Sequence, residues 1–399
     1  MSRSLWRLAA AVLACSLVAA ACGGGDGDEP AAPEPAPAPA PAPAETAPPE
    51  PPPPADPPPA PPAAEVETTQ PEAPQPAPPE PPPPTPEPPP PPPEPEEPAE
   101  PLRIAFFGFA AANGFAQATW AGIQEGAAEI GAEVQFFDPV FDANTQISQI
   151  QDAITAGDWD AFIVQANDGN AVIPVIEEAL AAGIPVIGEF TPIGPDFGTV
   201  EPQVEGLIFV GASPVLNGID LGAMAIDACG DRDPCNVVFL EGFRALPLDL
   251  ARTTAFAETV ASAPNVSLVA SVEGGYTPDS GLSAAQDVFI AHDDVHVMVG
   301  SDQSILGAEQ AANDAGVDVL LIGNGGSRQA VQAVREGRWH ATFLHAERDA
   351  GRTSFDIAVE AATGGNPPDS FDVTTLVPDV YGTKDVIEEH DIEGQWDAA

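Results

Sequence analysis

The chain has 399 residues, 51 of them proline, and its 61 acidic side chains against 12 lysines and arginines give a formal net charge of −49 at pH 7. Nucleic acid is excluded as a partner, because proteins bind it by neutralising phosphates with basic side chains. Direct docking on acidic membrane surfaces is excluded for the same electrostatic reason.

The first 21 residues have the parts of an export signal. Two arginines precede a largely apolar run over residues 8–21, and three alanines stand directly before Cys22. The run is too short for a membrane-spanning helix, which needs about 20 residues. Small residues before a cysteine resemble a lipoprotein signal, so residues 1–21 are expected to be removed and Cys22 to be diacylated. The alternative is an ordinary secretory signal with an unrelated cysteine.

Residues 22–100 have the composition of a disordered spacer. From Gly23 to Glu100 there are 36 prolines and 16 acidic residues, with no lysine or arginine. Low hydrophobicity and charge of one sign prevent a core from forming, and the prolines favour an extended backbone. We expect a tether, which leaves residues 101–399 as the working domain. That part keeps 45 acidic residues against 10 basic ones.

Residues 101–399 alternate buried-strand runs with helix-length amphipathic stretches, the pattern of parallel βαβ units. In the first half, strands are expected over residues 103–109, 134–138, 161–165, 186–190 and 207–211. In the second half, they are expected over residues 236–241, 266–272, 295–300, 319–323 and 341–345. Helices between them include residues 115–131, 171–182 and 249–261, with helix stops at Gly131, Gly157, Gly183 and Gly316. The two halves predict two doubly wound α/β lobes, with ligands binding beyond the carboxyl ends of the strands.

Two cysteines lie in the working domain, Cys229 and Cys235. An exported protein meets an oxidising environment, so a disulfide between them is expected. The chain-entropy estimate for so short a loop is about 2 kcal/mol. A zinc site is the alternative, but it needs two further ligands and no histidine lies nearby in the sequence. We therefore expect no metal.

Residues 102–390 resemble the ribose-binding-protein family of type I periplasmic binding proteins. The likeness is clearest in the Gly-Ile-Pro-Val-Ile segment at 183–187 and in the segment at 165–172 before it. It continues in Asn-Gly-Phe at 113–115, Gly-Ser-Asp at 300–302 and Gly-Asn-Gly-Gly at 323–326. The order and spacing of these segments carry the resemblance, more than any one motif.

The resemblance implies two lobes joined by a three-segment hinge near residues 211–213, 345–347 and 377–380. The N-lobe then comprises about 102–211 and 347–377, and the C-lobe about 213–345 and 380–399. It also implies a monomer that closes on a small polar ligand, in the first place a monosaccharide or polyol, and delivers it to an ABC permease at the outer face of the cell membrane. A sensor that presents a sugar or an autoinducer-like molecule to a membrane receptor is the alternative.

Arg252 is the first candidate binding residue. It stands ten residues after Gly242 and four before Phe256, the spacing of the ligand-contacting arginine in the family. A planar guanidinium suits paired hydroxyls or a carboxylate. A structural salt bridge is the alternative.

Three further positions match contact residues of the family. Asn113 resembles a ligand-binding asparagine, with helix capping as the alternative. Phe115 resembles a ring that stacks on the sugar, with core packing as the alternative. Tyr276 falls at a second stacking aromatic, with a surface turn as the alternative.

Other positions depart from the family pattern. Asn324 replaces an aspartate, Ser301, followed by Asp302, replaces an asparagine, and His345 replaces a glutamine. Glu189 and Phe190 stand where the family has Asp-Arg, in a register uncertain by one residue. Losing a carboxylate removes a strong acceptor, so Glu189 is a candidate for the missing one, and ribose cannot simply be copied as the ligand.

An enzyme is the main competing class. The glycines over residues 108–114 have the wrong spacing for a dinucleotide fingerprint, and the chain shows no P-loop, nucleophile elbow or metal-ligand pair. No catalytic residue and no cofactor is therefore expected. A repressor of the lac type shares the two lobes, but it needs an N-terminal helix-turn-helix where this chain has a signal and an acidic spacer.

Overall fold

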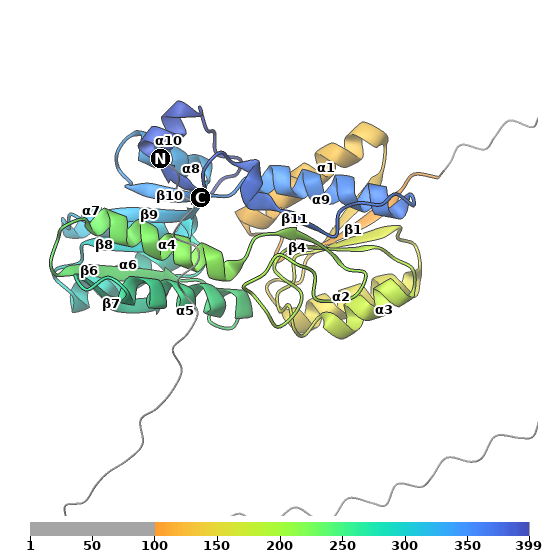
Figure 1. The fold of residues 1–399 in the computed structure, drawn as a ribbon, viewed down its shortest axis with the longest axis horizontal. Helices are drawn as coiled ribbons and strands as arrows, with labels where there is room; N and C mark the ends of the chain where they lie inside the picture. Colours follow the sequence, from red (N-terminus) through yellow and green to blue (C-terminus); the bar gives the residue numbers. More distant parts are fainter. Residues whose placement is uncertain (1–99, 399) are drawn as a thin grey trace, which may run out of the picture. The chain divides into compact units, whose positions relative to one another are not determined.

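The computed structural model describes residues 100–398. The export signal, the lipidated Cys22 and the spacer expected at positions 1–99 lie outside the described residues. Within residues 100–398 the alternating strand and helix runs fold into two lobes, each built on a six-stranded sheet with helices on both faces (Figure 1).

The first lobe has the strand order β11-β5-β4-β3-β1-β2, and all neighbouring strands are parallel. The strands are β1 (Arg103–Phe107), β2 (Glu133–Phe137), β3 (Ala161–Val164), β4 (Val186–Phe190), β5 (Ile208–Gly211) and β11 (Ser370–Asp372). Its helices are α1 (Gly114–Ile130), α2 (Ala143–Ala156), α3 (Ile173–Ala181) and α9 (Glu347–Ala362). Helices α1 and α9 cover one face of the sheet, and α2 and α3 cover the other.

The second lobe has the order β12-β10-β9-β8-β6-β7. Its strands are β6 (Cys235–Glu241), β7 (Val266–Glu273), β8 (Val297–Gly300), β9 (Leu320–Gly325), β10 (Ala341–Leu344) and β12 (Tyr381–Thr383). Its helices are α4 (Pro214–Cys229), α5 (Pro247–Ala261), α6 (Pro278–Ala291), α7 (Asp302–Ala315), α8 (Arg328–Arg335) and α10 (Lys384–Glu389). A 3₁₀ turn, Val373–Leu376, precedes β12.

The two-lobed α/β fold predicted from the alternation is confirmed, and each of the ten expected strands forms with its ends shifted by no more than two residues. Three of the expected helix stops, Gly131, Gly157 and Gly316, cap their helices in the left-handed conformation. Gly183 is also left-handed, but Ala182 caps α3. The second sheet is mixed where a parallel one was expected, because β12 pairs antiparallel with β10.

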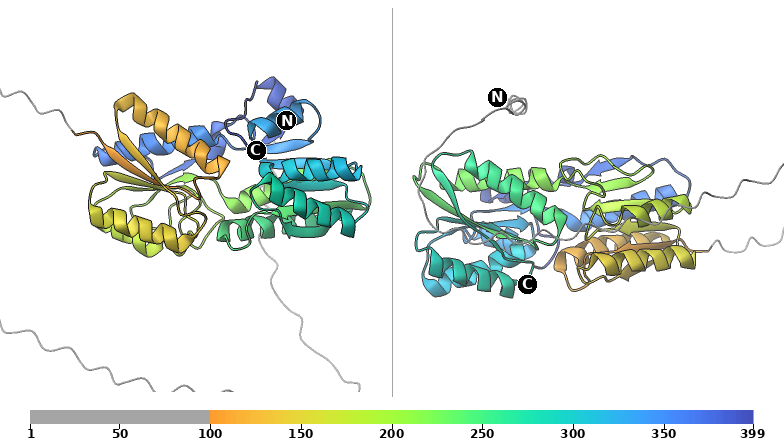
Figure 2. Two further views of the ribbon diagram at one scale, coloured as in Figure 1. Left: turned by 180° about the vertical axis from the view of Figure 1, so that it is seen from behind. Right: turned by 90° about the horizontal axis from the view of Figure 1, so that it is seen from below.

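The chain passes between the lobes three times, as Figure 2 shows from two sides. The passages lie between β5 and α4, between β10 and α9, and between β11 and β12. Helix α9 and strand β11 thus return to the first lobe after the second is largely complete.

Three further observations concern the described residues. Cys229 at the end of α4 is bonded to Cys235 at the start of β6, with the two Cα atoms 5.8 Å apart. Across residues 100–398, no helix is long and apolar enough to cross a membrane. In the same range, no group of three or more His, Cys, Asp or Glu side chains has the arrangement of a metal site.

Candidate functional site

A cavity that is partly open to solvent lies between the two lobes at the carboxyl ends of their strands, with about 480 Å³ of space not filled by atoms, open solvent included. This is where open parallel sheets bind ligands. The first lobe contributes Phe109, Asn113, Phe115, Phe141 and Phe190 to its wall. The second lobe and the passage after β10 contribute Leu246, Leu248, Arg252, Tyr276, Gln303, Asn324 and His345. A ligand in this cavity therefore touches both lobes.

The first lobe presents mainly aromatic rings. Phe115 and Phe190 meet edge to face with ring centroids 4.8 Å apart, and Phe109 meets Phe190 in the same way at 6.1 Å. Phe115 and Phe190 also contact the His345 ring, at 5.7 and 5.6 Å. Aromatic pairs favour this edge-to-face geometry, and each contributes about 0.5 to 1.5 kcal/mol beyond its buried area, so the rings support one another along the wall.

Two phenylalanines of the wall have an unusual backbone conformation. Phe141 has φ of 59° and Phe190 has φ of 60°, in the left-handed region that bulky residues rarely adopt. The Phe141 N–H donates to the Phe109 carbonyl at 2.8 Å, and a tight turn at Phe190 is closed by a 2.7 Å hydrogen bond from the Thr191 N–H to the Glu189 carbonyl. Such strain persists only where the surroundings hold it, and it gathers at functional sites.

Asn113 caps a helix, which was the alternative to ligand binding, and it also lies on the cavity wall. Its Oδ1 accepts from the Ala116 N–H at 3.0 Å and so caps α1. The residue also lines the pocket, and its Nδ2 has no hydrogen-bond partner among residues 100–398. Helix capping thus orients the side chain and leaves its donor available.

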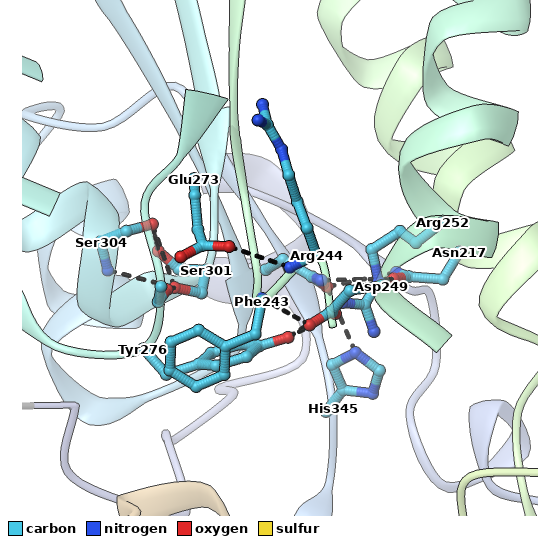
Figure 3. A network of polar contacts seen from close by, with 12 residues as sticks. Asn217, Phe243, Arg244, Asp249, Arg252, Glu273, Tyr276, Ser301, Ser304 and His345 are labelled. Atoms are coloured by element: carbon cyan, nitrogen blue, oxygen red, sulfur yellow. Dashed lines mark hydrogen bonds and ion pairs between the residues drawn. The ribbon is translucent and has the colours of Figure 1, made fainter. Parts of the chain in front are cut away.

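The second lobe places a buried polar network against the cavity (Figure 3). Arg252 donates from Nε to Asn217 Oδ1 at 2.6 Å and from Nη1 to Asp249 Oδ1 at 2.7 Å. The Tyr276 hydroxyl donates to the same Asp249 oxygen at 2.5 Å, and the Phe243 N–H donates to the other at 2.8 Å. Burial raises the pKa of Asp249, and the charge of Arg252 opposes that rise.

The network extends to His345. Its Nε2 lies 3.2 Å from Asn324 Oδ1, and the amides of Asn324 and Asn217 exchange two hydrogen bonds, each 3.2 Å long. Burial, together with the charge of Arg252, lowers the pKa of His345 to about 3. The imidazole is therefore neutral at pH 7, and with Nε2 donating to Asn324 its Nδ1 is an acceptor.

Three candidate residues from the sequence lie outside the wall of the cavity. Ser301 caps α7, accepting from the Ser304 N–H at 3.1 Å and donating to the Gly275 carbonyl at 3.0 Å. Asp302 accepts from the Ser327 N–H at 2.7 Å and the Thr342 hydroxyl at 2.9 Å. Burial raises the pKa of Asp302 to about 6. Glu189 is fully buried and does not line the cavity, whereas Phe190, the next residue, does.

Glu189 belongs instead to a buried acidic pair. Neither of its carboxyl oxygens has a hydrogen-bond partner in the described part of the chain. Burial raises the pKa of Glu189 to about 8. Burial and the charge of Glu189 also raise the pKa of Glu347, whose Oε1 accepts from the Thr119 hydroxyl at 2.6 Å. The pair therefore holds at least one proton at pH 7.

The sequence analysis missed several residues of this site. Wall residues that it did not single out are Phe109, Phe141, Leu246, Leu248 and Gln303, and the network adds Asn217 and Asp249. Phe109 ends an expected strand, and Phe141 and Gln303 each lie three residues beyond one, so inspecting a few residues past every strand end would have found these three. Asp249, three residues before Arg252 on the same helix, was a second usable signal.

Comparison with known proteins agrees with this architecture. Residues 104–366 match the family described as periplasmic binding protein domain. The chain is 27% identical to the ribose import binding protein RbsB of Bacillus subtilis over 243 residues, covering 60% of this chain and 74% of that protein. It is 24% identical to the galactofuranose-binding protein YtfQ of Escherichia coli over 284 residues, covering 69% and 87%.

A solved structure gives the same result. An ABC transporter solute binding protein from Mycobacterium smegmatis with bound glycerol superposes with a TM-score of 0.62 at 26% identity, covering 75% of this chain and 100% of that one. The chain belongs to the periplasmic binding proteins, in the type I group that resembles ribose-binding protein. This family is one of substrate-binding proteins, and it indicates a place outside the cytoplasm.

Proposed function

We propose that the protein captures a monosaccharide or polyol between its lobes and delivers it, chemically unchanged, to the permease of an ABC transporter. The observation that carries this is the cavity itself, which sets rings of the first lobe opposite a polar network of the second. Sugar rings offer both apolar C–H faces and hydroxyls, and such a wall is complementary to both. The names of the relatives, with ribose, galactofuranose and glycerol as ligands, support the same class.

Capture follows from contacts to two lobes at once. A ligand stabilises the closed form only by what it binds there and cannot bind in the open form. Arg252 and Tyr276 contact it from one side, and Phe115 and Phe190 from the other. Rotation about the three passages near residues 211–213, 345–347 and 377–380 then brings the walls together. The ion pair of Arg252 with Asp249 keeps the guanidinium in place before the ligand arrives.

The proposal is tested by binding. The purified protein is screened by thermal unfolding against ribose, galactose, arabinose, myo-inositol and glycerol, with isothermal titration for any ligand that raises the Tm. A ligand at 100 times its Kd is expected to add about 2.7 kcal/mol to the free energy of unfolding. If no sugar or polyol raises the Tm, and mass spectrometry of the denatured protein finds none bound, the ligand class is wrong.

A further inference from the structure

The cavity divides the polar and apolar groups unevenly between its two sides. Four of the five wall residues of the first lobe are phenylalanines, at positions 109, 115, 141 and 190. Asn113 is the one polar side chain on that side of the wall, and its Oδ1 is already engaged in capping α1. A ligand hydroxyl turned toward the four rings finds no acceptor there.

No acidic side chain belongs to the described wall of the cavity. The carboxylate of Asp249, behind the wall, accepts hydrogen bonds from Arg252, Tyr276 and the Phe243 N–H. The carboxyl group of Asp302 is held by Ser327 and Thr342. Glu189 is fully buried and does not line the cavity. Ligand hydroxyls therefore meet none of the carboxylate acceptors that bind them most strongly.

Most of the polar side-chain atoms left free on the wall belong to the second lobe, and they include both donors and acceptors. Arg252 Nη2 and the Gln303 amide have no hydrogen-bond partner among residues 100–398, although both residues line the cavity. The free acceptors on the wall are Gln303 Oε1 and His345 Nδ1. This side suits ring and hydroxyl oxygens that accept hydrogen bonds, together with a small number of donating hydroxyls.

We propose that the site binds a deoxy sugar in preference to its fully hydroxylated counterpart. Such a ligand has one side that carries oxygens and another that lacks a hydroxyl. The oxygens of the ligand face Arg252 and Gln303, and the carbon that lacks a hydroxyl faces the four phenylalanine rings. This inference rests on the proposed function, the capture of a sugar, and narrows the class of sugar that is bound. A hydroxyl buried against the rings would lose its water and find no acceptor for its proton there. In an apolar pocket, discrimination against one added hydroxyl reaches about 10- to 100-fold.

Isothermal titration of the full chain with matched sugars tests this. The pairs are D-fucose with D-galactose, L-rhamnose with L-mannose, and 2-deoxy-D-ribose with D-ribose. In the pair that binds, the deoxy member is expected to bind about 10- to 100-fold more tightly. Equal or tighter binding of the hydroxylated member overturns the inference and leaves sugar capture standing. If no sugar of any pair binds, the inference falls, and the proposed function is then decided by the wider screen of sugars and polyols described above.

A variant of the wall tests the cause of the preference. Phe190→Asn adds a donor and an acceptor to the apolar side, and asparagine tolerates the left-handed backbone at this position better than phenylalanine does. The preference for the deoxy member is expected to fall to about threefold or less. Phe141→Asn, also at a left-handed position, serves if the first variant does not fold. Phe289→Asn, on α6 away from the cavity, is the matched control. An unchanged preference in the folded wall variants overturns the inference.

Discussion

At the residue scale, Arg252 makes the structural salt bridge that was the alternative to ligand contact, and it also lines the cavity. Its Nε and Nη1 are bound within the protein, and its Nη2 has no hydrogen-bond partner among residues 100–398. Arg252→Ala is expected to weaken ligand binding about 10- to 150-fold, because a hydrogen bond from a charged group contributes about 1.5 to 3 kcal/mol. Titration calorimetry measures this loss, and wild-type affinity in the variant would remove Arg252 from the site.

The same variant also tests the buried ion pair. Removing Arg252 leaves Asp249 buried without its partner, which destabilises proteins by about 3 to 5 kcal/mol. The double variant Arg252→Ala, Asp249→Asn is expected to recover much of the Tm and none of the affinity, so the two roles separate. Arg244→Ala is the matched control, because Arg244 also pairs with a carboxylate, Glu241, but its side chain is 60% exposed. That variant should change neither quantity measurably.

A second prediction at this scale concerns Glu189 and pH. The folded protein holds the Glu189 proton up to about pH 8, whereas an unfolded chain releases a glutamate proton near pH 4.3. The unfolded state thus binds fewer protons between these values, and stability falls as the pH rises through them. Glu189→Gln keeps the neutral shape and is expected to be about 2 to 4 kcal/mol more stable than wild type at pH 8, with little difference at pH 4.

Thermal unfolding of both proteins from pH 4 to pH 8.5 measures this difference. Glu258→Gln, at an exposed site on α5, controls for removing one negative charge from a strongly acidic protein. Parallel curves for wild type and Glu189→Gln would contradict the buried proton.

At the element scale, the alternation of strands and helices was enough to place ten strands, because each is a buried run flanked by helix-length segments. Strands β11 and β12 were not predicted. Each has only three residues, too few to show a hydrophobic period, and each forms because the chain returns to a sheet whose edge is already built. That return comes from tertiary structure, which local pattern does not encode.

The residues of the site, like the strands, were predicted in part. Motif spacing placed Arg252, Tyr276, Asn113, Phe115, Asn324 and His345 near one another, and all six line the cavity. It gave no sign of Phe141, which reaches the pocket only through a left-handed turn held by the Phe109 carbonyl. It also could not tell whether Glu189 or Phe190 faces the ligand, because one residue of register reverses the two sides of a strand.

A disulfide is expected to hold the loop between α4 and β6. Cys229 and Cys235 are buried and joined there. We expect no free thiol at these positions in unreduced, denatured protein. Replacing both by alanine should lower the free energy of unfolding by about 2 kcal/mol, from the entropy of closing so short a loop. Thiol titration and calorimetry test this, and two free thiols in natively purified protein would contradict it.

At the scale of the whole molecule, attachment to the membrane is expected to depend on Cys22 alone. The part of the chain from residue 101 onward carries 45 acidic and 10 basic residues, so acidic lipid surfaces repel it. We propose that a lipid on Cys22 is the anchor. Cys22→Ala should move the protein from the membrane fraction to the soluble fraction in fractionated cells, with Cys15→Ala as the matched control. Membrane attachment that persists in Cys22→Ala would place the anchor elsewhere.

The last prediction concerns closure of the two lobes. The cavity wall is divided between them, so a ligand that binds both walls shifts the population from open to closed forms. Spin labels on exposed helix positions of the two lobes, through Asp152→Cys and Asp287→Cys, should show a broad distance distribution without ligand and a narrow, displaced one with it. A pair within the first lobe, Asp152→Cys with Glu177→Cys, should not change.

The Arg252→Ala variant separates affinity from closure. In a titration with ligand, it should reach the same closed distance as wild type, but at a ligand concentration about 10- to 150-fold higher. Identical distributions with and without bound ligand would show that the lobes do not close on it, and release to a permease would then need another signal.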